Sequence, residues 1–560
     1  MVDNSKLAAH DAAETIEHAD VIPSHQQHQQ HHHEEHGSKD KAADVLEDAG
    51  HSAVLTPENN ARVLRLIDWR VLPIVLGIYF LQALDKATLA YGSVFGLVTE
   101  AHLHGHQYSW LGAVVYLAQL ICQLIVAYTL VKVPLGKFLG VVVFCWGAVL
   151  AGMAGAKSFP SFLVCRMLLG AFEAGVAPAF ISVTQMWYRR REQPVRLGAW
   201  YAMNGITNMF GSLLSWGLGH ISSATLAPYQ ARSLITLIND KANDLCQVIF
   251  LFFGLLTVVF SAVVLIFMPD SPINAKFLKG EDKLIAVERL RLNQQGIKND
   301  VWKWDHVKEA VYDPKTWLWF SMLFSISVPS GGISTFGPLM IKGFGYDQFT
   351  TILFNMPFGA VQLIATMGGA YVAMVWKLKS PVLMFLSIPP IIGCVMLLVL
   401  THDSAHKGPL LVGYYLISVY PGITPLIYSW QAANTAGETK KKTTTAIMIV
   451  GQSAGNVLGP NLYTTEEAPL YRRGLISNLV LFVVLIILYA IQVFILKIQN
   501  HKHEKTRESL GKTAEVVDKS MAPVKAVGDD DPKAEMSANA LDRSLQDITD
   551  WHNEDFVYVY

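Results

Sequence analysis

Residues 161–191, SFLVCRMLLGAFEAGVAPAFISVTQMWYRRR, decide the fold class of this chain. The run from Ser161 to Met186 is mostly apolar and long enough for a helix to cross the roughly 30 Å of hydrocarbon in a bilayer. It ends at three consecutive arginines, and short loops rich in Lys and Arg stay on the cytoplasmic side of a membrane. The stretch therefore predicts a transmembrane helix that ends in the cytoplasm.

Eleven further apolar runs have a similar length, and the twelve runs together predict an all-α polytopic membrane protein with twelve transmembrane helices. The runs are approximately 71–94, 110–130, 138–156, 161–186, 197–218, 248–268, 317–340, 350–373, 381–400, 410–429, 443–463 and 475–496. The composition agrees, since 52% hydrophobic and 16% charged residues do not suit a surface that faces water. The start of the chain is polar and acidic and does not resemble a cleavable signal peptide.

The charge of the loops predicts the orientation. Cations gather in alternate loops, which we place in the cytosol together with both termini. These loops carry Lys132, Lys137, Arg189, Arg190, Arg191, Arg196, Lys377, Lys379, Lys440, Lys441 and Lys442.

Polar segments divide the chain into five parts. We predict a disordered, His-rich cytosolic tail at 1–66, a first six-helix half at 67–268 and a cytosolic connector at 269–316. A second six-helix half covers 317–497, and a second disordered cytosolic tail covers 498–560. Asp313 followed by Pro314 predicts a capped start for the seventh helix.

An internal duplication relates the two halves. Gly175-Val-Ala-Pro178 in span 4 has the spacing of Gly422-Ile-Thr-Pro425 in span 10, and Asn208-Met-Phe-Gly211 in span 5 matches Asn456-Val-Leu-Gly459 in span 11. Their ordered placement at equivalent spans predicts parallel, pseudo-symmetric repeats.

Three ionisable residues lie at the middle of predicted spans: Asp85 and Lys86 in span 1, and Glu173 in span 4. Each costs about 2.5–3.5 kcal/mol at the bilayer centre, so they should face the interior of the bundle. In one interpretation, Lys86 and Glu173 form a salt bridge that only holds two helices together. In the other, Lys86 attracts an anionic substrate while Asp85 or Glu173 takes up and releases a proton.

Arg166 lies two helical turns before Glu173, where it either steers an incoming carboxylate or extends to the membrane interface. Amide and hydroxyl side chains form a second set of candidates for the pathway, although each could instead bond a neighbouring helix. This set comprises Asn204, Asn208, Asn355, Gln362, Tyr420, Gln452 and Asn456.

The sequence contains no nucleotide-binding loop, HExxH motif, CxxC pair or nucleophile elbow, so we expect neither an ATP-driven pump nor an enzyme, and no cofactor. The His-rich run at 25–36 could bind a transition metal, but we interpret it as part of the disordered tail and expect no metal site. His102, His104 and His106 either sense external pH or have no special role. We expect a monomer in the lipid bilayer that does not bind nucleic acid.

Several stretches resemble the fungal allantoate permease family, the anion:cation symporter branch of the major facilitator superfamily. They are LDKATLAYG at 84–92, RMLLGAFEAGVAPAF at 166–180, MWYRRREQPVRLG at 186–198, ANTAGETKKKTTTA at 433–446 and AGNVLGPNLYTTEEAPLYRRG at 454–474. The final residues, DITDWHNEDFVYVY, also look like that family's ending.

The resemblance implies the major facilitator fold and proton-coupled uptake of a small organic anion, such as a carboxylate, a vitamin or an allantoate-like nutrient, across the plasma membrane. Two features depart from the wider superfamily. The loop LVKVPLGKFLG lacks the acidic GxxxDR form, which leaves gating open, and span 5 lacks the Gly-Pro signature of drug antiporters, which favours import. Export of a metabolite or toxic compound, and a nutrient sensor without transport, are the alternatives.

Overall fold

The computed structural model describes residues 55–94, 107–156, 158–220, 245–291, 301–346, 348–401, 406–463, 470–512 and 547–560. All of them belong to one compact unit, Asp40–Tyr560. The His-rich run and the three histidines at 102–106 lie outside these residues. Every regular element in the described part of the chain is a helix.

The first half of the bundle contains six predicted spans. They are α5 (Leu72–Val94), α7 (Gln107–Lys132), α8 (Leu135–Gly152), the pair α9 (Phe159–Glu173) and α10 (Val176–Trp187), α11 (Gln193–His220) and α13 (Leu245–Phe267). A 3-10 turn, η1 (Met153–Gly155), follows α8.

The second half repeats this order. It contains α16 (Pro314–Gly343), the pair α17 (Gln348–Leu353) and α18 (Asn355–Trp376), α19 (Ser380–Val399), the pair α20 (Lys407–Ile417) and α21 (Ile423–Ala433), α22 (Glu438–Asn461) and α23 (Arg472–Ser509). The 3-10 turn η3 (Tyr420–Gly422) separates α20 from α21. The duplicated glycine motifs thus lie at equivalent breaks, between α9 and α10 and between η3 and α21. As predicted, α16 begins at Pro314, and Asp313 Oδ1 accepts a hydrogen bond from the Lys315 amide at 3.0 Å.

Seven helical spans in the described part of the chain are long and apolar enough to cross a bilayer, with α9–α10 and α20–α21 each counted as one span, or eight if the bent α7 is one span. α22 does not meet this criterion, because Thr, Gln, Asn and Gly are frequent along it and three lysines lie in its first turns. Helices of this kind need shelter from lipid, and α22 packs along both α16 and α7.

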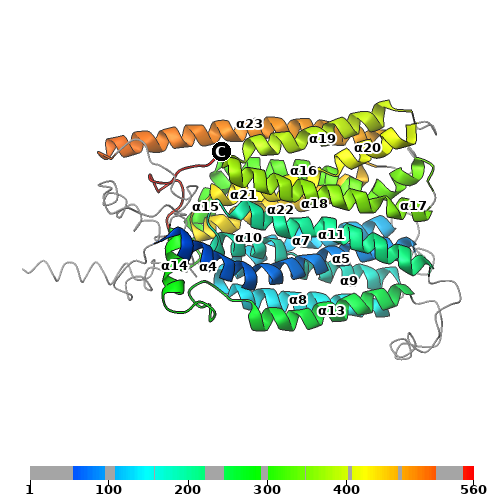
Figure 1. Cartoon of the computed structure of the whole chain (residues 1–560), viewed down its shortest axis with the longest axis horizontal. Coiled ribbons are helices and arrows are strands. Elements are labelled where there is room, and N and C mark those ends of the chain that lie inside the picture. The colour runs from blue at the N-terminus through cyan, green and yellow to red at the C-terminus, as the bar shows by residue number, and fades with distance from the viewer. Residues whose placement is uncertain are drawn as a thin grey trace, which may run out of the picture. The chain divides into compact units, whose positions relative to one another are not determined.

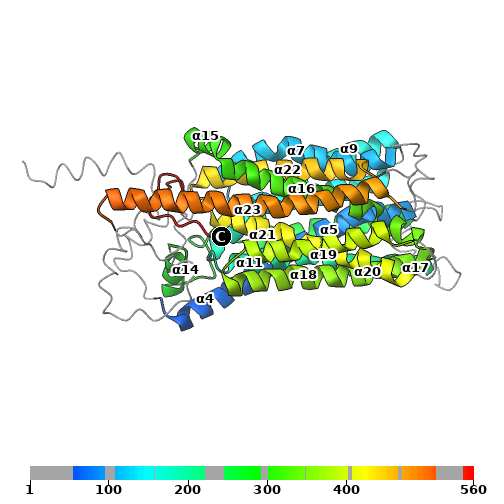
Figure 2. The ribbon, with the colours of Figure 1, turned by 90° about the horizontal axis from the view of Figure 1, so that it is seen from above.

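Two helix pairs join the halves: α7 packs along α22, and α11 packs along α18. In Figure 1 the long helices run in one common direction, and α4 (Pro57–Arg70), α14 (Glu281–Arg291) and α15 (Trp304–Tyr312) gather at one end of them. We call this end of the bundle the connector end. Figure 2 shows the same end from above, with α23 extending beyond the other helices.

The basic loops lie at the connector end. Asp270, which follows α13, accepts hydrogen bonds from the amides of Gly136 and Lys137 at 3.0 and 3.3 Å. Arg190 and Lys379 both contact the C-terminal residues, which are anchored near α15. In place of the acidic residue missing from LVKVPLGKFLG, Asp270 therefore supplies a carboxylate to this loop.

The structure differs from the sequence-based prediction in both tails. Residues 57–66 are helical, because Thr56 and Asn59 form a capping box and Val63 and Ile67 are buried one turn apart. α23 continues to Ser509, and residues 547–560 are largely buried against the connector end. These segments differ from the predicted disorder: α4 is held by its cap and by two buried apolar residues, and the acidic side chain of Asp550 pairs with buried Lys315 and Lys440.

Candidate functional site

The intramembrane charges predicted from spans 1 and 4 come together in the first half of the bundle. Lys86 Nζ lies 3.5 Å from Glu173 Oε2, which joins α5 to α9. The same oxygen accepts hydrogen bonds from Gln82 at 3.2 Å and from Gln119 at 3.3 Å. Glu173 therefore forms the centre of a polar cluster contributed by three helices.

Asp85 belongs to the same cluster but has a different environment. It is 1% exposed, and Trp146 Nε1 on α8 donates a hydrogen bond to its Oδ2 at 2.7 Å. The nearby charges that act on Asp85 are those of Glu173 and Arg166. Two carboxyl groups in one buried site interact unfavourably when both are ionised, so this arrangement disfavours the state in which both carry a charge.

Arg166 is 2% exposed and faces the interior of the bundle, so the prediction that it extends to the membrane interface is wrong for this conformation. Its Nε and one of its Nη atoms have no hydrogen-bond partner among the described residues. A buried guanidinium with unused donors is suited to bind a carboxylate.

Lys86 differs from the other three charged residues because it is accessible. Its side chain is 37% exposed, whereas that of Glu173 is fully buried. The ammonium group also lies 5.9 Å from the centre of the Tyr116 ring. Lys86 can therefore contact Glu173 and a bound molecule from the same position, and the salt-bridge interpretation and the substrate interpretation are compatible.

The predicted amides fall into two groups. Four of them, Gln362 included, make contacts between helices: Asn204 donates to Tyr79 Oη at 2.9 Å, and Asn208 donates to Gln362 Oε1 at 3.0 Å, which joins α11 to α18. Gln452 accepts a hydrogen bond from Tyr428 at 2.6 Å and lies 3.5 Å from Tyr201 Oη.

Two other amides donate hydrogen bonds to nearby backbone carbonyls. Asn355 donates to the Thr351 carbonyl at 3.3 Å, and Asn456 donates to the Gln452 carbonyl at 3.0 Å, four residues earlier in each case. The structure does not bring these two side chains into contact with the charged cluster. Tyr420 lies beside α16, where its hydroxyl is 3.5 Å from Ser330 Oγ.

A layer of aromatic rings lies between the charged cluster and the connector end. Tyr79 and Tyr201 have ring centres 5.6 Å apart, and Tyr201 lies 6.4 Å from Tyr428 of the second half. Trp200 packs against Tyr79 at 4.9 Å. Tyr79 precedes Lys86 by seven residues, about 10 Å along α5 toward the connector end. The halves are therefore in contact on the connector side of the cluster.

Sequence reasoning missed several members of this site. Gln82 lies one turn before Lys86, so helical spacing could have placed it on the same face. Trp146 is surrounded by apolar residues and the aromatic layer resembles ordinary core, so neither gave a signal.

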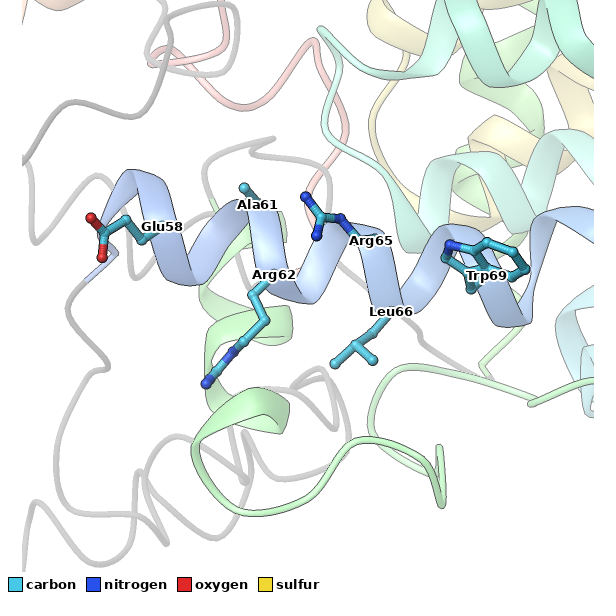
Figure 3. A pocket seen from close by; sticks show the side chains of 6 residues that line it. All are labelled: Glu58, Ala61, Arg62, Arg65, Leu66 and Trp69. Carbon is cyan, nitrogen blue, oxygen red and sulfur yellow. The ribbon is translucent and has the colours of Figure 1, made fainter.

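A separate hollow of about 320 Å³ lies on the surface of α4 (Figure 3). Figure 3 shows that all six lining side chains come from this one helix, and Trp69 among them is 76% exposed. The hollow lies outside the helix bundle, so we do not assign it to the pathway. No group of His, Cys, Asp and Glu within the described ranges could hold a metal ion.

Comparison with known proteins identifies the family. The Major Facilitator Superfamily profile matches residues 75–460. The chain belongs to the major facilitator superfamily. The allantoate permease of Saccharomyces cerevisiae is 30% identical over 84% of this chain and 86% of its own length. The thiamine pathway transporter THI73 of the same yeast is 31% identical over 80% of this chain and 82% of its own. An uncharacterized transporter of Schizosaccharomyces pombe is 33% identical over 80% and 82% of the two chains.

Solved structures agree on the fold. The transporter FucP in its outward conformation gives a TM-score of 0.55 at 10% identity, covering 75% of this chain and 98% of that one. An inward-facing bacterial homologue of the lysosomal transporter Spinster gives 0.53 at 14% identity, covering 75% and 96%. The major facilitator protein described here is thus a multi-pass membrane transporter with the twelve-helix, two-half fold, and it is not an enzyme. The predicted resemblance to the allantoate permease family is confirmed.

Proposed function

We propose that this transporter takes up a small organic anion together with protons across the plasma membrane, by alternating access. The observation that carries the proposal is the composition of the buried cluster. Asp85 and Glu173 balance Lys86 and Arg166, so the cluster has no net formal charge when all four residues are ionised.

Charge balance couples the anion to a proton. A carboxylate that binds Lys86 and Arg166 adds one negative charge to a site where Asp85 and Glu173 are buried. Uncompensated charge is costly at this depth, and proton uptake by either acid restores neutrality. The anion and the proton would therefore enter and leave together. The names of the relatives include a permease for allantoate, which supports an anionic cargo.

The orientation follows from loop charge. The basic loops lie at the connector end, and such loops remain in the cytosol. We therefore propose that the connector end and both termini are cytosolic. In this orientation the aromatic layer closes the cytosolic side, and the cluster receives its anion from outside the cell.

Uptake measurements test the proposal. A strain that lacks its own copy of the protein is supplied with radiolabelled allantoate, nicotinate, pantothenate and biotin at pH 5 and pH 7. We expect uptake of at least one of them that rises at the lower pH. Lys86→Ala and Glu173→Gln should each reduce that uptake by roughly tenfold or more, the effect of losing a charge-assisted contact of about 1.5–3 kcal/mol.

Matched controls are available on α15. Lys308 and Asp305 form an exposed pair, so Lys308→Ala and Asp305→Asn change the same kinds of charge outside the bundle and should leave uptake intact. Full uptake in both Lys86→Ala and Glu173→Gln would refute the assignment of these residues. Accumulation of a compound inside the deletion strain without any uptake defect would favour export instead.

A further inference from the structure

The last fourteen residues of the chain, 547–560, form a segment that is bound at the connector end outside the charged cluster. We call it the C-terminal segment; it is drawn in red at the connector end in Figure 1. Asp550 and Phe556 are fully buried, and Thr549 and Tyr558 are each 1% exposed. Burial of this degree in a polar terminal segment indicates a dedicated site for it.

The end of the segment is recognised through its backbone by two asparagines. Asn500 of α23 accepts from the Tyr558 amide and donates to its carbonyl, both at 2.9 Å. Asn434, which follows α21, accepts from the Val559 amide at 2.7 Å and donates to its carbonyl at 2.9 Å. Paired contacts of this kind fix the register of the peptide, because a shift by one residue would break all four hydrogen bonds.

The start of the segment is held by charge. Asp550 contacts Lys315 Nζ of α16 at 2.5 Å and Lys440 Nζ of α22 at 2.8 Å, and all three side chains are nearly inaccessible. Asp547 contacts Lys303 at 2.9 Å and accepts a hydrogen bond from the Glu438 amide at 2.7 Å. Release of the segment would remove the carboxylate of Asp550 from two buried ammonium groups, which is costly.

These anchors all belong to the connector or the second half, but one contact reaches the first half. Arg190, in the loop between α10 and α11, donates to the Val557 carbonyl at 3.2 Å. Its guanidinium lies 4.4 Å from the centre of the Phe556 ring. Arg190 is 1% exposed, so this contact between the halves is shielded from water. Hydrogen bonds and cation–π contacts are strongest in such shielded sites.

We infer that the C-terminal segment is an intramolecular ligand of the connector end that holds the two halves closed there. It is anchored on the second half and bound to the first through Arg190. Alternating access separates the halves at this end, which must break the Arg190 contact or release the segment. A bound segment therefore favours the state closed at the connector end, and its release favours the open state.

Two cysteine reporters separate docking from closure. The five native cysteines are replaced by alanine in the full-length chain, which is placed in lipid nanodiscs so that both faces are accessible. Thr549→Cys reports whether the segment is bound. Ala370→Cys on α18 reports whether the halves are closed, because Ala370 is fully buried at the close contact with Gly198 of α11. The measured quantity is the rate of reaction with a maleimide.

Asp550→Asn should accelerate both reporters by roughly tenfold, the effect of losing a charge-assisted contact on a docking equilibrium. Arg190→Ala should accelerate Ala370→Cys while Thr549→Cys stays protected, because the anchors on the second half remain. Asp305→Asn, on an exposed side chain of α15, should change neither rate. None of these readouts depends on the cargo, so failure here is distinguishable from failure of the proposed uptake.

A peptide supplied in trans tests the site directly. Removal of residues 547–560 should accelerate Ala370→Cys, and a synthetic peptide of these residues should restore the slow rate. The same peptide with Asn in place of Asp550 should not. Unchanged Ala370→Cys reactivity in Asp550→Asn, in Arg190→Ala and in the truncated chain would overturn the inference, as would a truncated chain that the peptide fails to protect.

Discussion

At the scale of single residues, the buried charges of this transporter are stabilised by donors that come from different helices. Glu173 is bound by side chains of α5 and α7, and Asp85 is bound by the indole of Trp146 on α8. Each contact links an ionisable group to a neighbouring helix. Under the proposed function, protonation of either acid or binding of the anion would therefore act directly on contacts between helices.

The Trp146 contact predicts a measurable effect on stability. Trp146→Phe keeps the aromatic ring but leaves the buried Asp85 oxygen without its 2.7 Å donor, which should lower the free energy of unfolding by about 1–3 kcal/mol. Trp187→Phe is the matched control, because Trp187 is fully buried but its Nε1 has no hydrogen-bond partner in the described part of the chain. Thermal unfolding in detergent should show a lower midpoint for the first variant only; equal shifts would contradict the prediction.

The C-terminal segment should respond to pH through His503. Burial lowers the pKa of His503, whose Nδ1 lies 3.0 Å from the Phe556 carbonyl and whose ring lies 5.3 Å from that of Tyr558. The hydrogen bond to the Phe556 carbonyl and the charge of Asp550 oppose this effect, whereas Arg507 and Lys315 add to it. A His whose folded-state pKa is lowered binds its proton more readily when the segment is released, so docking should weaken as pH falls below about 6.5.

Asp550 should not contribute to that pH dependence. Lys315 and Lys440 hold its pKa well below the usual range, so it stays ionised in the docked state throughout pH 5–8. We expect the reactivity of Thr549→Cys, normalised to that of an exposed cysteine at position 305, to rise between pH 7 and pH 5. His503→Asn, which retains a donor near the Phe556 carbonyl, should abolish the rise. A rise that persists in this variant would place the sensing group elsewhere.

The sequence predicted the charged cluster but not its surroundings. Asp85, Lys86 and Glu173 are conspicuous because ionisable residues are rare in apolar runs. Tyr79, Tyr201 and Tyr428 are not, because aromatic residues in such runs are equally common in cores, and only the contact between the two halves distinguishes them. The pairing of Asn434 and Asn500 with the C-terminal segment depends on residues far apart in sequence, so no local pattern could predict it.

At the scale of helices, the close approach of α11 and α18 depends on glycine. A Cβ on Gly359 would lie 2.6 Å from the Gly205 carbonyl oxygen, closer than any real contact of this kind. Gly359→Ala should therefore push these helices apart and lower the free energy of unfolding by about 1–3 kcal/mol. Gly368→Ala on the same helix meets nothing within 4 Å and should be neutral or slightly stabilising. Thermal unfolding of the two variants checks this, and equal midpoints would count against it.

Helix positions were the most predictable part of the fold, since each apolar run coincides with a helix or with a pair of helices. The breaks were less predictable: α9 ends at Glu173 and α10 begins at Val176, within a run that showed no interruption in hydropathy. At the ends of the chain, the prediction missed the ordered residues 57–66, 498–509 and 547–560. Composition describes how a segment behaves in water, and it does not register partners such as Lys315 and Lys440 that neutralise the acidic segment in the folded chain.

At the scale of the whole molecule, the two halves contact each other through an equivalent pair of interfaces. α7 meets α22 and α11 meets α18, which are the second helix of each half against the fifth helix of the other. A two-fold relation of this kind allows one half to rock against the other around a central site. The aromatic layer and the C-terminal segment both add contacts at the connector end, so this conformation is closed there.

The closed connector end predicts from which side the cluster is reached. In a cysteine-free background, Lys86→Cys should react with a membrane-impermeant maleimide in intact cells, because the Lys86 side chain is 37% exposed and Tyr79 and Tyr201 lie between it and the connector end. Tyr116→Cys, beside Lys86, provides a second reporter that leaves the charges intact. A cysteine at position 305 on α15 should react only after the cells are permeabilised, which checks the proposed orientation. The prediction fails if position 305 behaves as expected but both cluster reporters react only after permeabilisation. That result would mean that the site opens toward the connector end, and that the contacts between the halves there do not close the pathway.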